Sequence, residues 1–201
     1  MVSLSYNLLK RLVETPAPPG FEDRVRRIVL EVISDLGFEA EADSLGNVYV
    51  KVGSGQPTTL IAAHMDEVGF MVKGITSRGF LKVVSLGGIN PSTAIGSEVV
   101  VMCDKGDLAG IVGSIPPHIA GRDGREVRIE DLFIDIGASS AKEAEEMGVT
   151  KGTPITFMGR FRESGKVVMG KAFDDRLGCF TLLEALKTAN PPEKGTVYVV
   201  F

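Results

Sequence analysis

A histidine and two carboxylates follow a short apolar run in the first third of the chain. Residues 59–63 are apolar or β-branched, and they lead into His64-Met65-Asp66-Glu67. Side chains alternate along an extended segment, so His64 and Asp66 are predicted to lie on the same side. An imidazole can bind a metal ion through one nitrogen while the other donates to a carboxylate. The stretch is therefore a candidate metal site, and a histidine merely hydrogen-bonded in a polar turn is the alternative.

A second polar cluster lies far along the chain, at Asp174-Asp175-Arg176. It opens a predicted helix, and aspartate is a favoured residue at a helix N-terminus. One interpretation is structural, with one aspartate capping the helix and the other pairing with Arg176. The other is chemical, because a carboxylate at the end of a loop can bridge two divalent ions.

The elements expected to position these clusters are of α/β type. Residues 4–14 and 21–36 have apolar side chains at helical spacing, and Gly37 is expected to end the second helix. Residues 38–42 and 48–52 are predicted strands around a turn at residues 43–47. Residues 59–63 and 196–201 are continuous apolar runs, typical of strands buried on both faces. In open α/β sheets, ligands bind beyond the carboxyl ends of such strands, where His64 stands.

The middle of the chain has a different pattern of short β-like runs separated by glycine-rich turns. Such spacing is typical of a compact antiparallel barrel or sandwich. We therefore predict the fold class α/β, with a doubly wound, peptidase-like sheet interrupted by an inserted small β-barrel-like domain. The expected domains are an α/β domain formed by residues 1–70 and 164–201, and a β-rich insert formed by residues 71–163.

Composition narrows the possible partners. A formal net charge of −4 gives no reason to expect nucleic acid or an anionic membrane. No apolar run of about 18 residues and no secretory signal pattern occurs, so the expected location is cytoplasmic. Cys103 and Cys179 each stand among apolar residues and are expected to be buried free thiols. His118 follows two prolines and is expected at the surface or in an interface.

Taken together, the motifs resemble the M42 family of metallo-aminopeptidases, some members of which have been labelled endoglucanases. The resemblance spans essentially the whole chain, and the joint order and spacing of its motifs make it specific. The motifs are TPAPPGFE at residues 15–22, DSLGN at 43–47, HMDEVG at 64–69, GSIPPH at 113–118 and KAFDDRLG at 171–178.

The resemblance implies a peptidase with two divalent metal ions, zinc or cobalt. By motif position, His64 would bind one ion, Asp174 would bridge both, and Asp66 would serve catalysis by holding His64 in place. The implied substrates are peptides, hydrolysed at their N-terminal residue. The β-rich insert would mediate dimerisation, and the family forms larger homo-oligomers.

One departure from the family pattern is large. In the family, a Glu-Glu pair that supplies the catalytic base and a ligand follows the strand equivalent to residues 196–201. A further aspartate and a distant histidine complete the site, and none of these positions exists here. We therefore expect an N-terminal portion of such an enzyme that is inactive alone. The alternatives are an inactive assembly or regulatory subunit, or a related metal-dependent amidohydrolase such as a deacylase.

Overall fold

The structure is a computed structural model, which describes residues 6–115, 126–188 and 190–201. His118 lies outside these residues. The chain divides into two compact units. The first comprises Met1–Asp66 and Gly159–Phe201, and the second comprises Glu67–Met158.

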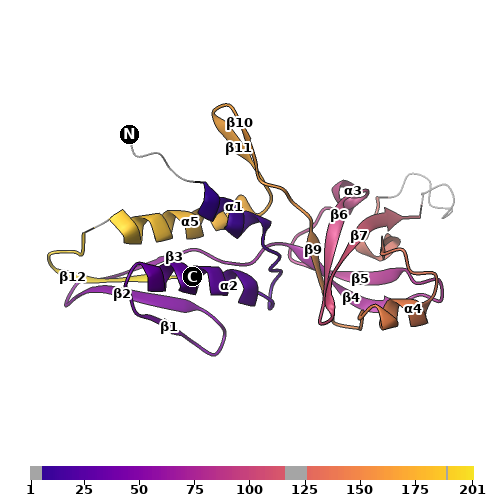
Figure 1. Cartoon of the computed structure of the whole chain (residues 1–201), viewed down its shortest axis with the longest axis horizontal. Helices are drawn as coiled ribbons and strands as arrows, with labels where there is room; N and C mark the ends of the chain where they lie inside the picture. The colour runs from indigo at the N-terminus through magenta and orange to yellow at the C-terminus, as the bar shows by residue number, and fades with distance from the viewer. Residues whose placement is uncertain (1–5, 116–125, 189) are drawn as a thin grey trace. The chain divides into compact units, whose positions relative to one another are not determined.

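The first unit combines helices with a four-stranded sheet (Figure 1). Its helices are α1 (Asn7–Glu14), α2 (Asp23–Asp35) and α5 (Phe173–Thr188). Its sheet strands are β1 (Ala40–Ala42), β2 (Val48–Ser54), β3 (Thr58–Ala62) and β12 (Gly195–Val200). The order across the sheet is β1-β2-β12-β3, with β12 antiparallel to β2 and parallel to β3. The strand predicted at residues 196–201 thus lies inside the sheet.

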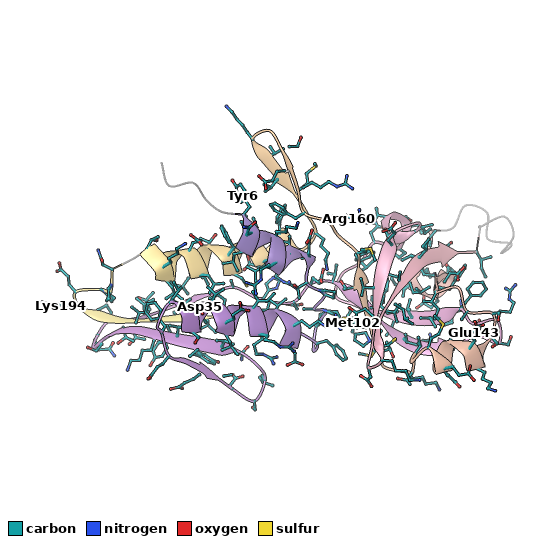
Figure 2. The ribbon with its side chains drawn as sticks, viewed as in Figure 1. Tyr6, Asp35, Met102, Glu143, Arg160 and Lys194 are labelled. Atoms are coloured by element: carbon teal, nitrogen blue, oxygen red, sulfur yellow. The ribbon has the colours of Figure 1, made fainter. Side chains whose placement is uncertain are left out.

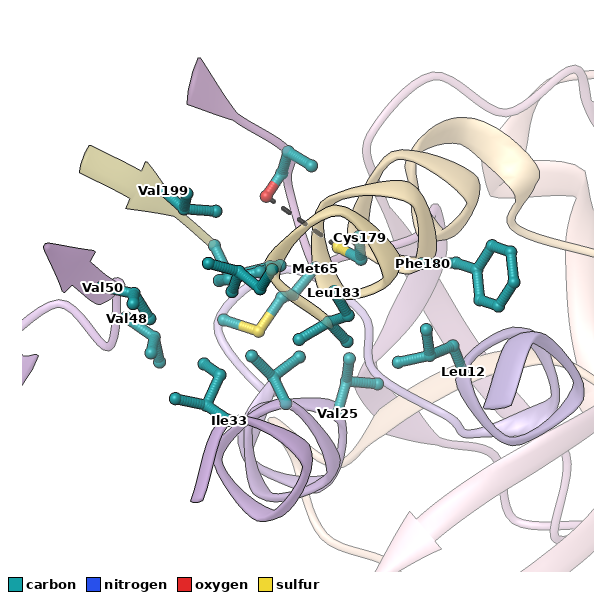
Figure 3. Packing of buried hydrophobic residues seen from close by; sticks show 14 of the residues in the cluster. Leu12, Val25, Ile33, Val48, Val50, Met65, Cys179, Phe180, Leu183 and Val199 are labelled. Carbon is teal, nitrogen blue, oxygen red and sulfur yellow. Dashed lines mark hydrogen bonds between the residues drawn. The ribbon is translucent and has the colours of Figure 1, made fainter. Parts of the chain in front are cut away.

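The core of this unit forms between the helices and one face of the sheet (Figure 3). Alternation along β2 points Val48 and Val50 inward, and both side chains are fully buried. Helix α2 adds Val25, Val29 and Ile33 at helical spacing. The apolar side chains that recur at helical spacing in α2 and at every second residue in β2 therefore pack together in one layer.

The prediction that residues 59–63 form a strand buried on both faces is wrong, because all five residues of β3 are exposed. Leu60 is 62% exposed and Ile61 is 45% exposed. The apolar composition suggested burial on both faces, but β3 is the edge strand of the four-stranded sheet and pairs there with β12. Burial begins just beyond the strand, at Ala63.

The second unit is built on a closed antiparallel barrel with its own hydrophobic core. The barrel strands, in spatial order, are β4 (Gly69–Ile75), β5 (Leu81–Leu86), β8 (Leu132–Asp135), β7 (Gly106–Ser114), β6 (Glu98–Cys103) and β9 (Pro154–Phe157). Short helical segments accompany it at α3 (Pro91–Ala94), η1 (Ile129–Asp131) and α4 (Ala141–Glu146). The predicted class, α/β with an inserted small β-barrel, is confirmed.

A separate hairpin in the first unit leads back toward α5. It consists of β10 (Arg162–Ser164) and β11 (Val167–Met169), and its side chains extend outward (Figure 2). At its base the backbone N–H of Phe161 donates to the carboxylate of Glu14 over 2.8 Å, which ties the hairpin to the end of α1. Across the described residues, no helix has the length and apolar character needed to cross a membrane.

Candidate metal site

His64 stands directly beyond the end of β3 and lies between two carboxylates. Its Nδ1 is 2.8 Å from Oδ1 of Asp66, and its Nε2 is 3.0 Å from Oδ1 of Asp174. The backbone N–H of Ala63 donates to the carbonyl of Val200 over 3.0 Å, so β12 holds the backbone just before the histidine. The three site residues predicted from the sequence are therefore in direct contact.

The two carboxylates change the acidity of His64. Partial burial lowers the pKa of the imidazole. The hydrogen bond that the ring donates to Asp174, and the charge and hydrogen-bond acceptance of Asp66, raise the pKa by more. The net pKa lies above its usual value of 6.5. The two carboxylates thus favour the protonated, positively charged form of the imidazole.

The two adjacent aspartates have separate roles. Asp174 and Asp175 have non-helical backbone angles, so regular helical geometry in α5 begins at Arg176. Oδ1 of Asp175 accepts a hydrogen bond of 3.1 Å from the backbone N–H of Gly178, as an N-cap side chain does. Asp175 thus caps the helix, and the neighbouring Asp174, whose side chain is 95% exposed, faces His64. The sequence left these roles open between the two aspartates.

Arg176 is a residue whose importance the sequence did not reveal. Its side chain is completely buried, and Nη1 donates to the carbonyls of Leu12, over 2.5 Å, and Thr15, over 3.2 Å. These carbonyls belong to the C-terminal end of α1, where a positive charge is favourable. The sequence indicates only an aspartate as the partner of Arg176, because these acceptors are backbone atoms more than 150 residues away.

Cys179 contacts the backbone that carries His64. Its Sγ donates to the carbonyl of His64 over 3.3 Å and approaches the carbonyl of Ala63 at 3.9 Å. The dashed line from Cys179 in Figure 3 marks the second of these contacts. Burial raises the pKa of this thiol to about 12, although the charge of Arg176 opposes the shift. Cys103 and Cys179 are both buried and free, as predicted.

The turn at residues 43–47 is fixed beside a cavity that reaches His64. The carboxylate of Asp43 accepts from the backbone N–H groups of Leu45, over 2.9 Å, and Asn47, over 3.0 Å. The cavity has a volume of about 270 Å³ and is bordered by this turn, the start of α2 and the His64–Asp66 segment. The turn and the His64–Asp66 segment thus line the same cavity.

Imidazole nitrogens and carboxylate oxygens are atom types that bind divalent metal ions in proteins. With Nδ1 held by Asp66, His64 presents Nε2 as a ligand, and a carboxylate oxygen of Asp174 lies next to it. Zinc sites that catalyse reactions have three protein ligands as a rule. Within the described ranges, no group of three or more histidine, cysteine, aspartate or glutamate side chains could hold an ion. The residues fit as part of a metal site.

Comparisons with known proteins agree with the motifs. The profile of the M42 glutamyl aminopeptidase family matches residues 46–201. Lysyl aminopeptidase of Pyrococcus furiosus is 33% identical over 202 residues, which cover 98% of this chain and 58% of that protein. The chain thus spans about half the length of the curated relatives it matches.

Solved structures show the same relationship. The TET aminopeptidase of Thaumarchaeota archaeon SCGC AB-539-E09 superposes with a TM-score of 0.89 at 41% identity, over 96% of this chain and 57% of that chain. A TET1 peptidase of Pyrococcus horikoshii, described as able to assemble into a tetrahedron or a large octahedral shell, gives a TM-score of 0.86 at 36% identity. That match covers 96% of this chain and 59% of the other.

Proposed function

Because this chain belongs to the M42 family of glutamyl aminopeptidases, we propose that its gene product is a two-metal aminopeptidase that removes N-terminal residues from peptides. The observation that carries this proposal is His64, held between Asp66 and Asp174 at the end of a strand. Both carboxylates contact the same imidazole, one on each nitrogen. Such an arrangement is suited to orienting a metal ligand.

We assign the three residues distinct tasks. Nε2 of His64 and the carboxylate of Asp174 would hold the two ions, zinc or cobalt. Asp66 accepts from Nδ1–H and thereby fixes the tautomer and the ring orientation. Paired metal ions, when bound, polarise a peptide carbonyl and activate water. Two protein ligands do not complete such a site, so we propose that the remaining ligands and the general base come from outside these 201 residues.

Self-association is part of the same proposal. The β-rich insert, predicted at residues 71–163, would form the contact in a dimer or larger homo-oligomer. The described assembly of the Pyrococcus horikoshii relative supports self-association. The preferred N-terminal residue is left open, because the matched profile is named for a glutamyl enzyme and a matched relative for a lysyl enzyme.

The test is hydrolysis of aminoacyl-anilides by the gene product, with zinc or cobalt added and after chelation. We expect turnover that chelation abolishes and metal restores, and no turnover by the 201-residue chain alone. Cleavage of N-acyl amino acids in place of aminoacyl-anilides would identify a deacylase. Absence of both activities with metal bound would support an assembly subunit and contradict the proposal.

A further inference from the structure

The exposed carboxylate of Asp174 is not positioned by its own contacts. Its side chain is 95% exposed, and within the described part of the chain its polar contact is the 3.0 Å one to His64. A single exposed ion pair holds two side chains weakly, because solvent screens the charges and the ordered rotamers lose entropy. The backbone that carries Asp174 must therefore set its place.

That backbone is anchored two residues further on, by Arg176. The guanidinium is completely buried, and Nη1 joins the carbonyls of Leu12 and Thr15 at the end of α1. The backbone N–H of Arg176 also donates to the carbonyl of Ala172 over 3.1 Å, which closes the turn that contains Asp174. One residue thus fixes the start of α5 both to a neighbouring helix and to the preceding loop.

The hydrogen bonds of the Arg176 guanidinium are of a strong type. Hydrogen bonds from a charged group are stronger than neutral ones, and here the guanidinium also faces the negative end of a helix dipole. Breaking these hydrogen bonds while the guanidinium stays buried would cost much free energy, because a buried charge needs hydrogen-bond partners. The first turn of α5 is consequently confined, whereas Asp174 itself is solvated.

We propose that Arg176 is a positioning residue, which holds Asp174 against His64 by fixing the start of α5 to the C-terminal end of α1. This role deepens the proposed function, and its relevance to metal binding rests on that function. The placement of Asp174 against His64 does not depend on metal, so it can be measured in the metal-free chain.

The experiment follows the ring nitrogen resonances of His64 by NMR at one fixed pH of about 5, where the imidazole carries a proton on both nitrogens and can donate to both carboxylates. The chain contains only two histidines, so His64→Ala assigns the signals. Asp174→Ala defines the signal position when the contact is lost. We expect Arg176→Met to move the His64 Nε2 resonance at least halfway toward that position, and Arg176→Lys to move it less, because lysine keeps a charged donor.

Leu9→Ala is the matched control. Leu9 is buried in the same core on α1, and its truncation lowers stability without removing a hydrogen bond. We expect this variant to unfold at a lower temperature with the His64 resonances unchanged. If Arg176→Met does not fold, the comparison of Arg176→Lys with Leu9→Ala decides the question.

Two results would overturn the inference. The first is an Arg176 variant that folds with the His64 resonances at their wild-type positions. The second is Leu9→Ala moving them as far as the Arg176 variant does, which would reduce Arg176 to general support of the fold. Neither result depends on peptidase activity, so the proposed function could fail while Arg176 is still shown to position Asp174.

Discussion

Nε2 of His64 lies 3.0 Å from Oδ1 of Asp174, although 110 positions separate the two residues in the chain. The histidine comes from the end of β3, and the aspartate comes from the start of α5. Asp66 holds the other ring nitrogen at 2.8 Å. The fold therefore brings His64, Asp66 and Asp174 into contact, and these are the three site residues predicted from the sequence.

Substitutions of the two adjacent aspartates should differ in their effect on stability. Asp175→Ala removes the N-cap of α5 and is expected to lower the free energy of unfolding by about 0.5–2 kcal/mol. Asp174→Ala removes an exposed side chain and should leave stability nearly unchanged, since surface substitutions usually act within about 0.5 kcal/mol. Urea denaturation of both metal-free variants measures the difference. Equal losses would show that the capping role is wrongly assigned.

Gly178 makes the cap possible by leaving room for it. A Cβ added at this position would lie 2.3 Å from Oδ1 of Asp175. In the wild-type background we expect Gly178→Ala to displace the cap and lower stability. In the Asp175→Ala background the same change should raise stability by up to about 1 kcal/mol, because alanine favours helix over glycine. A double-mutant cycle gives the coupling, and additive effects would count against this explanation.

The exposed edge strand should promote self-association of the 201-residue chain. Leu60 on β3 is 62% exposed, and unpaired strand edges bind other strands. We expect Leu60→Lys to reduce concentration-dependent association in sedimentation velocity. Leu45→Lys is the control, because Leu45 is 84% exposed but lies in a turn. An equal effect of both substitutions would indicate a general change of surface polarity and not an effect of the edge.

The metal-free chain should show a pH dependence that belongs to His64. Burial lowers the pKa of this imidazole, but Asp174 and Asp66 raise it to a net value above 6.5. The folded state thus binds the proton more tightly than the unfolded state does. The resulting stabilisation is complete below the usual value of 6.5 and is lost as pH rises through the raised pKa.

Thermal unfolding of wild type and His64→Asn checks this sign. The melting temperature of wild type should exceed that of His64→Asn by more at about pH 6 than at about pH 9. A constant excess, or one that grows with pH, would contradict the raised pKa.

The local patterns of the sequence predicted much of the fold and the site. Alternation along an extended segment placed Asp66 beside His64, and the glycine-rich β pattern predicted the barrel. Residue type alone did not show that β3 is an edge strand, because edge position is set by distant pairing with β12. The supports from Arg176 and Cys179 were missed for the same reason, since both donate to backbone carbonyls more than 100 residues away.

The proposed role of His64 and Asp174 as metal ligands is tested most directly by Asp174→Ala in the gene product. Metal content and aminoacyl-anilide turnover are measured together, with Glu41→Ala, an exposed carboxylate on β1, as the matched control. We predict that Asp174→Ala loses bound metal and turnover while Glu41→Ala retains both. Near-normal metal content and turnover in Asp174→Ala would contradict the account.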